Sequence, residues 1–468
     1  MRPAFFALIL FTCAANTARA HTMVTPYDLP ISFNAYVGAC AATLFLTFLA
    51  LAVLPVPPAA RAGRSIRLGT IFPAILRAVA VALLLLTIGA GLFGSPSPVA
   101  NIAPALFWIG FVLCLSVATA MVGDIFQIAN PWEDLLRLAG IGNRTRLPYP
   151  ERWGAWPAFV CYWGLAWLEL MAPPDPAFLA EALLAYTALT AAGSFLFGRD
   201  VWFRRAELFG MLFRTAGLLA CIAYERKPDG WHARWRPLLS GIEEIPPTGM
   251  AQLLFVLFLL AATSYDGVWQ TSFWAGLYWT HLLQWFGSLW GDDMARAQAI
   301  LAPGYWVWQR GGLIAAPFVY LGFYWAAMAT MRVLTRSALT TRDLSLRFAG
   351  SVVPIALSYL LAHSWTLLLT EIPVVPFLLT DPFGVGWNLL DLARTSAEPD
   401  SLNMGQVWHV EVALILQGHL ASVYAAHAIA VRLFPAGRVW LSELPLLVLM
   451  MGYTFIGLAV LALPLAVR

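Results

Sequence analysis

Long apolar stretches, separated by short polar segments, recur from one end of the chain to the other. Each is roughly 20 residues long, which as an α-helix is enough to cross about 30 Å of hydrocarbon. The pattern therefore predicts an all-α fold, a polytopic membrane bundle of about ten transmembrane helices. The predicted spans are 33–54, 72–94, 104–127, 153–172, 178–197, 248–265, 312–333, 348–370, 408–433 and 443–466.

The N-terminal segment 1–20 differs from these spans. It carries a basic Arg2, a short apolar core and a small-x-small sequence at 18–20. These features are typical of a cleaved secretory signal peptide. Cleavage would leave His21 as the N-terminus and residues 21–468 as a single transmembrane helical domain. An uncleaved first helix is the alternative.

Arginines are concentrated in every second loop between the predicted spans. Because short cytoplasmic loops are rich in Lys and Arg, we expect these loops to face the cytoplasm of a bacterial-type inner membrane. Both termini then lie on the outer side. Loops 95–103 and 172–177 contain no Lys or Arg, as expected of exterior loops. The arginines that follow the pattern are Arg61, Arg64, Arg67, Arg137, Arg144, Arg146, Arg152, Arg199, Arg204, Arg205, Arg332, Arg336, Arg342, Arg347 and Arg438.

Segment 201–224 is apolar enough to be an additional span, but its charges argue against that. Counting it as a span would also move the arginines of loop 336–347 to the outer side. We therefore predict one amphipathic helix in the cytoplasmic interface. The charged residues that share one face of this helix are Asp200, Arg204, Glu207 and Arg214.

Composition agrees with a membrane protein. Of 468 residues, 60% are hydrophobic and 11% are charged, whereas soluble domains carry about 25% charged residues. The net charge of +3 arises from arginines in loops, so the expected partner is the lipid bilayer and not nucleic acid. No P-loop, GxGxxG, HExxH or GxSxG motif is present, and such motifs mark many soluble enzymes. An enzymatic activity is therefore left open.

Polar residues inside the spans are the candidate functional groups, because ionisable side chains are costly in hydrocarbon. In span 408–433, Gln417, Tyr424 and His427 fall on one broad side and His419 on the other. A helix facing lipid would not carry polar groups on both sides. This span is therefore predicted to be central in the bundle.

Span 348–370 supplies a partner for it. A polar stripe runs along one face of this predicted helix, and Glu371 closes the stripe at the outer surface. We expect His363 of this stripe to meet His419 at similar depth in the bundle. Asp124, near the inner end of the third span, and Glu169, near the outer end of the fourth, add buried carboxylates. The members of the stripe are Tyr359, His363, Thr366 and Thr370.

These residues are compatible with three functions. The first is a transporter or permease, with a path for protons or a small solute along the intramembrane His and carboxylate groups. The second is a redox or metal-handling protein, with haem b or copper on His363 and His419, and with His21 as a further copper ligand. The third is a structural or assembly protein without a catalytic site. The residues assigned to the path are His363, His419, Tyr359, Tyr424, Gln417, His427, Glu371, Asp124 and Glu169.

Overall fold

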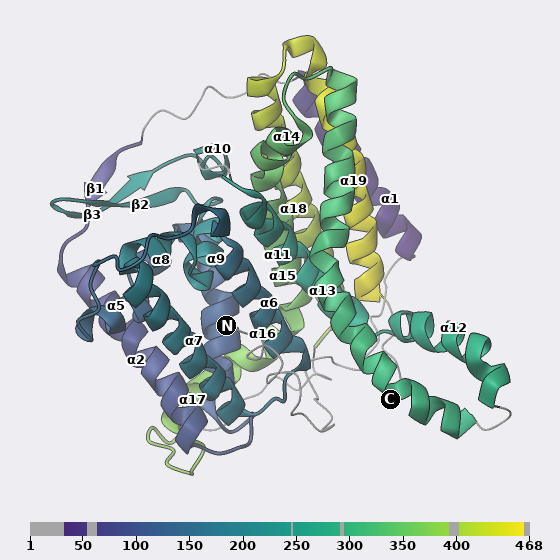
Figure 1. Ribbon diagram of the computed structural model, residues 1–468. Helices are drawn as coiled ribbons and strands as arrows, with labels where there is room; N and C mark the ends of the chain where they lie inside the picture. The colour runs from purple at the N-terminus through teal and green to yellow at the C-terminus, as the bar shows by residue number, and fades with distance from the viewer. Residues whose placement is uncertain (1–31, 54–62, 245–246, 291–293, 393–401, 463–468) are drawn as a thin grey trace.

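The computed structural model describes residues 32–53, 63–244, 247–290, 294–392 and 402–462 (Figure 1). The predicted signal peptide at 1–20 and the predicted N-terminal His21 lie outside the described residues. Within the described part of the chain, nine helices are long and apolar enough to cross a membrane. The prediction of a polytopic helical bundle is confirmed. The chain is a multi-pass membrane protein.

Most of these helices occupy the predicted positions, within a few residues at each end. Several of them change their hydrogen-bonding pattern along their length, and are named by their consecutive parts. In chain order they are α1 (Phe33–Val53), α2 (Ile71–Phe93), the run α3 (Ile102–Pro104), η1 (Ala105–Cys114) and α4 (Leu115–Val122), α7 (Pro176–Phe197), α11 (Met250–Trp269), α13 (Met294–Thr335), the run α14 (Thr341–Phe348), η4 (Ala349–Val352) and α15 (Val353–His363), α18 (Met404–Leu433) and α19 (Ala436–Ala462).

Shorter elements connect or accompany them. The predicted span 153–172 is α6, which has 16 residues, below the roughly 20 that a perpendicular span requires. The predicted span 312–333 is the second half of α13, a single helix of 42 residues. The shorter helices are η2 (Ile125–Gln127), α5 (Pro131–Leu138), η3 (Glu151–Trp153), α6 (Trp156–Met171), α8 (Arg199–Arg205), α9 (Leu208–Gly217), α10 (Gly241–Glu244), α12 (Ser272–Trp290), α16 (Trp365–Glu371), η5 (Ile372–Val374) and α17 (Val375–Thr380).

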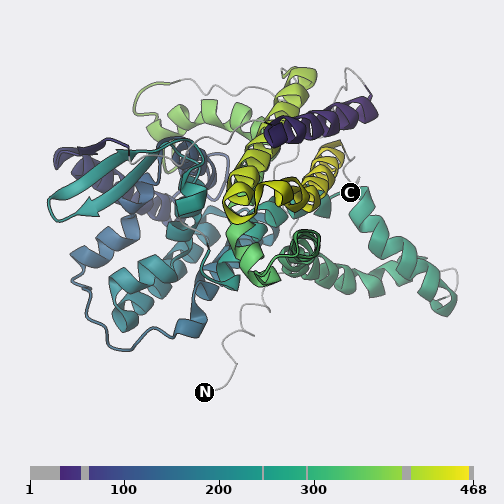
Figure 2. The same cartoon turned by 90° about the horizontal axis from the view of Figure 1, so that it is seen from above.

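The helices pack as two neighbouring groups. In one group α18 packs against α1, α15 and α19, and α13 packs against α11 and α19 (Figure 2). In the other group α2 packs against α7, and α9 packs against α4 and α6. Helix α11 joins the groups, because it contacts α6 on one side and both α13 and α15 on the other. The prediction that the 408–433 helix is central agrees with its three helical neighbours.

The prediction of one amphipathic helix over 201–224 is wrong. The chain forms α8 and then α9, and a break between them at Ala206 and Glu207 lets the Glu207 carboxylate accept hydrogen bonds from the first N–H groups of α9. Helix α9 is buried against α4 and α6, so it does not present a broad apolar face to lipid. The segment ends in a strand, since residue 222 begins β2.

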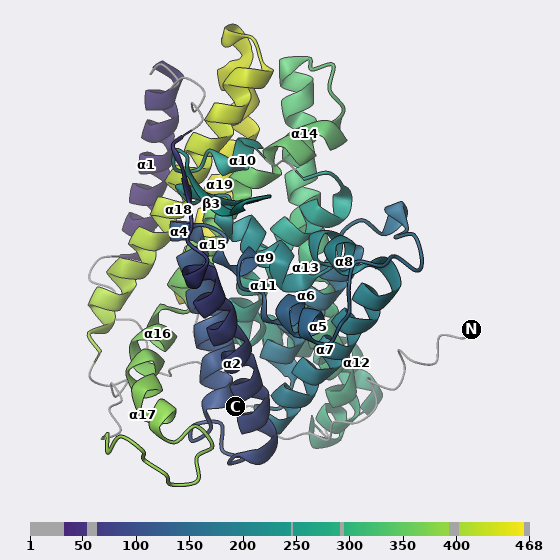
Figure 3. The same cartoon turned by 90° about the vertical axis from the view of Figure 1, so that its left-hand side faces the viewer.

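A small antiparallel sheet was not predicted at all. Its strands are β1 (Ser65–Arg67), β2 (Ile222–Lys227) and β3 (Gly230–Trp235), in the order β1-β3-β2. The sheet and α10 lie at one end of the bundle, here called the sheet end, while α12 and α17 lie at the opposite end (Figures 1 and 3). The arginine-rich strands are therefore separated from the aromatic helix α12 by the thickness of the bundle.

The prediction of one continuous helix over 348–370 is also wrong, because the helix is interrupted after His363. Helix α15 ends at His363, and the chain continues at an angle as α16 and α17, which lie beside the end of α2 far from the sheet (Figure 3). Val374 and Leu378 pack there against Ala90 and Ile102. The break places His363 at the end of a helix, inside the bundle.

Candidate functional site

His363 and Asp266 form the centre of the candidate site. The His363 Nε2 atom lies 2.8 Å from the Asp266 Oδ2 atom. The histidine side chain is 19% exposed and the aspartate side chain 30%, so both side chains are largely buried but remain partly accessible. Asp266 lies near the end of α11, and His363 is the last residue of α15. The pair therefore joins two helices at the point where one of them stops.

Two further carboxylates act on this histidine. Glu169 of α6 and Glu411 of α18 both lie within electrostatic range of the His363 ring, together with Asp266. Glu411 is fully buried, whereas Glu169 is exposed at the bundle surface. Four helices thus bring three carboxylates to one imidazole. Such a concentration of ionisable groups is costly in a membrane bundle, and it usually marks a path for ions or protons.

A chain of hydroxyl groups continues inward from the pair. Tyr359 lies one turn before His363 on α15, is buried, and sits next to Ser264 of α11. The Tyr320 hydroxyl donates to the Ser264 Oγ atom at 2.7 Å. Gly267 lies beside this chain, and a Cβ there would clash with the Val460 side chain but would only touch the Tyr359 hydroxyl and the His363 ring, at 3.7 Å. Ser264 and Tyr320 were not predicted as site residues.

The break after His363 changes the predicted polar stripe. Ser364 has φ −93° and ψ 8°, outside the helical range, and α16 begins at Trp365. Thr366 and Thr370 therefore belong to a different helix from Tyr359, and the Thr370 hydroxyl donates within α16 to backbone carbonyls at 3.1 Å. Glu371, half-buried, is the last residue of α16. The stripe was predicted as continuous, and it is not.

The second predicted histidine, His419, lies on the buried side of α18. It is 2% exposed, and its Nδ1 atom is 2.8 Å from the Ile415 carbonyl oxygen of the same helix. The His419 Nε2 atom and the Ser422 hydroxyl have no hydrogen-bond partner among the described residues. A neutral histidine has one donor and one acceptor nitrogen to satisfy. The predicted meeting of His419 with His363 stays a prediction.

His427 has a buried partner that the sequence did not reveal. The His427 Nδ1 atom lies 2.8 Å from the Glu443 Oε1 atom of α19, and both residues are at most 5% exposed. The other two residues predicted on its side of the helix are less enclosed, because Tyr424 is half-buried and Gln417 is exposed. This pair lies toward the sheet end of α18, away from His363.

Asp124 lies outside the helix in which it was predicted. Helix α4 ends at Val122, and the Asp124 Oδ1 atom accepts a hydrogen bond from the Gln127 N–H at 3.2 Å, which caps η2. Asp124 is buried beside Gly217 of α9. Burial raises the pKa of Asp124 to about 6, although the Arg214 guanidinium and backbone N–H groups act in the opposite direction.

This pKa gives a pH-dependent contribution to stability. Unfolded Asp titrates at about 3.9, so between about pH 4 and pH 6 the unfolded chain loses a proton that the folded chain retains. The folded state therefore loses stability as the pH rises through this window, by about 3 kcal/mol in total. Replacing Asp124 with Asn retains a capping side chain and removes this loss. We expect a higher melting temperature than wild type at pH 7 and a similar one at pH 4.

Asp343 provides the matched control for this experiment. It caps α14 at an exposed position, where its carboxylate accepts hydrogen bonds from the Thr340 N–H at 3.1 Å and from the Thr340 hydroxyl at 2.6 Å. Because this carboxylate is exposed, its ionisation carries no cost of burial, in contrast to Asp124. Asp343→Asn should lower the melting temperature slightly at pH 7. If the melting temperature changed with pH in the same way in wild type and in Asp124→Asn, the raised pKa of Asp124 would not be the cause of the pH-dependent stability.

A metal or haem site receives no support from the geometry. Within the described residues, no group of three or more His, Cys, Asp or Glu side chains is placed to hold a metal ion. His21, the further copper ligand predicted, lies outside them. Haem b or copper on His363 and His419 stays a prediction. No known protein family, curated protein or solved structure matches the chain.

Proposed function

We propose that the protein is a proton-translocating transporter and that His363 is its outer proton carrier. The observation that supports this most directly is the pairing of His363 with Asp266 at a helix break, with Glu169 and Glu411 in range. Imidazole changes its charge near physiological pH and is a common proton shuttle. Helix breaks inside a bundle are frequent at the binding sites of transporters, because they expose helix ends to the bound ion.

The proposed path continues along the buried side of α18. From Glu411 it passes His419 and Ser422, whose polar atoms lack partners among the described residues. It then reaches the His427–Glu443 pair near the sheet end. Each of these groups can accept or donate a proton, and together they are spaced along most of the helix. Of the other residues predicted for the path, Tyr359 lies beside His363 inside the bundle, Tyr424 lies near His427 on α18, and Glu371 would line the outer mouth.

The sheet end is assigned to the cytoplasm of a bacterial-type inner membrane in this proposal. This assignment is supported by the arginines of β1, β2 and β3 at that end, because cytoplasmic loops of inner-membrane proteins are rich in Lys and Arg. Reporter fusions after residues 145 and 340 should give a cytoplasmic signal, and fusions after residues 98 and 385 an exterior signal. An exterior signal at residue 340 would show that the orientation of the second half is wrong.

Proton flux into proteoliposomes tests the proposed function. The purified full chain is reconstituted around a pH-sensitive dye, and a pH gradient is imposed. We expect Asp266→Asn and His363→Gln each to lower the initial flux about tenfold or more, since a positioned proton carrier commonly contributes about 100-fold or more to a transfer rate. Glu181→Gln is the matched control, because Glu181 is an exposed acid on α7 outside the cluster.

Two outcomes would overturn the proposal. The first is a wild-type flux equal to that of empty liposomes under gradients of either direction. The second is an equal flux in wild type, Asp266→Asn and His363→Gln. An absorption spectrum and metal analysis of the same preparation give a separate check, because a Soret band lost in His363→Gln would indicate haem ligation instead.

A further inference from the structure

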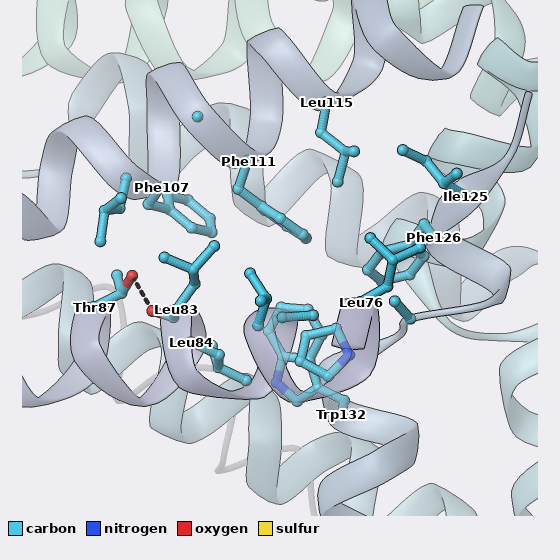
Figure 4. A pocket seen from close by; sticks show the side chains of 16 residues that line it. Leu76, Leu83, Leu84, Thr87, Phe107, Phe111, Leu115, Ile125, Phe126 and Trp132 are labelled. Carbon is cyan, nitrogen blue, oxygen red and sulfur yellow. Dashed lines mark hydrogen bonds between the residues drawn. The ribbon is translucent and has the colours of Figure 1, made fainter. Parts of the chain in front are cut away.

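An apolar cavity of about 290 Å³ lies between α2, η1, α4 and α5 (Figure 4). Aliphatic and aromatic side chains such as Leu84, Phe107 and Phe111 form its wall. Two polar groups also line it, and both already donate hydrogen bonds. The Thr87 hydroxyl donates to the Leu83 carbonyl at 2.8 Å, and the Trp132 indole N–H donates to the Thr187 hydroxyl at 2.9 Å. The cavity therefore suits an apolar occupant.

The cavity extends along α2 from Leu76 to Thr87. At 1.5 Å per residue this corresponds to about 16 Å. The hydrocarbon core of a bilayer is about 30 Å thick, so the cavity is about as long as the hydrocarbon of one leaflet. Its Leu76 end adjoins the loop between α4 and α5, which belongs to the sheet end of the bundle.

The cavity can be reached from the lipid side of α2. Val79 and Leu83 line it and are also 48% and 41% exposed on the bundle surface. The opposite wall is η1, a π-helix of ten residues. Such wide turns are rare and often occur at functional sites. Gly110 in this wall leaves space, since the nearest atom to a Cβ added there would be the Ala105 carbonyl oxygen at 3.7 Å.

We propose that this cavity binds one acyl chain of a bilayer phospholipid from the leaflet at the sheet end. An apolar wall with satisfied polar groups, a length of one leaflet and an opening toward lipid all fit a single hydrocarbon chain. The bilayer presents phospholipid chains at this opening at high local concentration. The proposal requires only that the chain is a membrane protein, and it is independent of proton translocation.

Photo-crosslinking tests this assignment. The full chain is reconstituted in phospholipid vesicles that contain a small fraction of phosphatidylcholine with a diazirine in the middle of one acyl chain. Crosslinked peptides are quantified by mass spectrometry. We expect preferential labelling of the lining residues Leu84, Phe107 and Phe111, none of which is exposed, over the outward face of α2. Gly110→Leu, which fills the cavity, should reduce this labelling to the level of the outward face, and Gly110→Ala should reduce it partially.

Gly89→Leu is the matched control on α2. A Cβ at Gly89 would meet no atom within 4 Å, so a leucine there extends into lipid without filling the cavity, and labelling should be unchanged. Even labelling along α2 that Gly110→Leu leaves unchanged would overturn the proposal. So would displacement of the label by free fatty acid but not by unlabelled phospholipid. Thermal unfolding of each variant separates loss of binding from loss of fold.

Discussion

Glu443→Leu is expected to lower the free energy of unfolding by about 3–5 kcal/mol, the range measured when one member of a buried ion pair is removed. His427 and Glu443 lie 2.8 Å apart between α18 and α19, and both are at most 5% exposed. Removing the carboxylate leaves the imidazole without its partner in an apolar interior, and the full cost of desolvation is no longer offset. The measurement is equilibrium unfolding in mild detergent.

The double variant makes this prediction specific. His427→Leu should cost a similar amount, because it leaves the Glu443 carboxylate buried alone. In His427→Leu/Glu443→Leu both polar groups are gone, so the stability should return to within about 1 kcal/mol of wild type. Additive losses in the double variant would show that the two side chains act separately. If the pair also belongs to the proton path, the double variant should fold and still fail to transport protons.

His409 supplies a control for the loss of any histidine from α18. Its Nε2 atom lies 3.0 Å from the Tyr36 hydroxyl at a partly exposed position near the start of the helix. Water can replace that bond, so His409→Leu should cost no more than about 1 kcal/mol. Both variants replace a histidine of α18 with leucine, so the difference between their unfolding free energies reports the effect of burying the histidine.

The length of the apolar stretches was sufficient to predict the nine long apolar helices of the described residues, although a tenth predicted span, 153–172, is shorter. Hydrocarbon requires such helices, because a helix satisfies the hydrogen bonds of its own backbone. The length of the stretches was not sufficient where helices change direction. The break after His363 has no Pro or Gly beside it in the sequence, since Ser364 and Trp365 follow and the next proline is Pro373. In the structure α16 packs against η1, and η5 and α17 pack against α2 and α3, and these tertiary contacts cannot be read from the local sequence.

The missing sheet had a local signal. Pro228 and Asp229 lie between the two strands and Gly230 begins the second one, and the sequence Pro-Asp-Gly between two short segments is typical of a turn. The preceding apolar segment favoured a helix, and that interpretation was extended too far, to residue 224. The strand β1 comes from residues 65–67, far away in sequence, so its pairing could not be read locally.

The candidate site was predicted in part. Its histidines follow from their cost in hydrocarbon, but their acidic partners depend on helix boundaries that are uncertain by a few residues. The predicted span 248–265 ended one residue before Asp266, which was therefore placed outside the membrane. Glu443 was the first residue of a predicted span, whereas α19 begins at Ala436 and carries it about two turns inward. Because of these small errors in the predicted helix boundaries, Asp266 and Glu443 were not recognised as the partners of His363 and His427.

Trp132→Ala is expected to have an effect of similar size to Glu443→Leu, about 3–5 kcal/mol, which is typical for truncating a buried tryptophan. Trp132 is 1% exposed, and its ring stacks on Phe209 with centroids 5.1 Å apart and planes 11° from parallel. The edges of Tyr186 and Phe111 close two further sides at 5.2 Å and 5.8 Å. One side chain therefore joins α5 to η1, α7 and α9.

Two further variants separate the contributions of this ring. Trp132→Phe keeps an aromatic ring but loses the hydrogen bond to Thr187, so it should cost clearly less than Trp132→Ala. Trp285→Ala is the matched control, since Trp285 on α12 is 73% exposed, and a change there should stay within about 0.5 kcal/mol. Equal unfolding free energies for Trp132→Ala and Trp285→Ala would mean that α5 is not held by this cluster. The loop that carries Asp124 leads directly into α5, so loosening α5 should also weaken the pH dependence that Asp124 gives to stability.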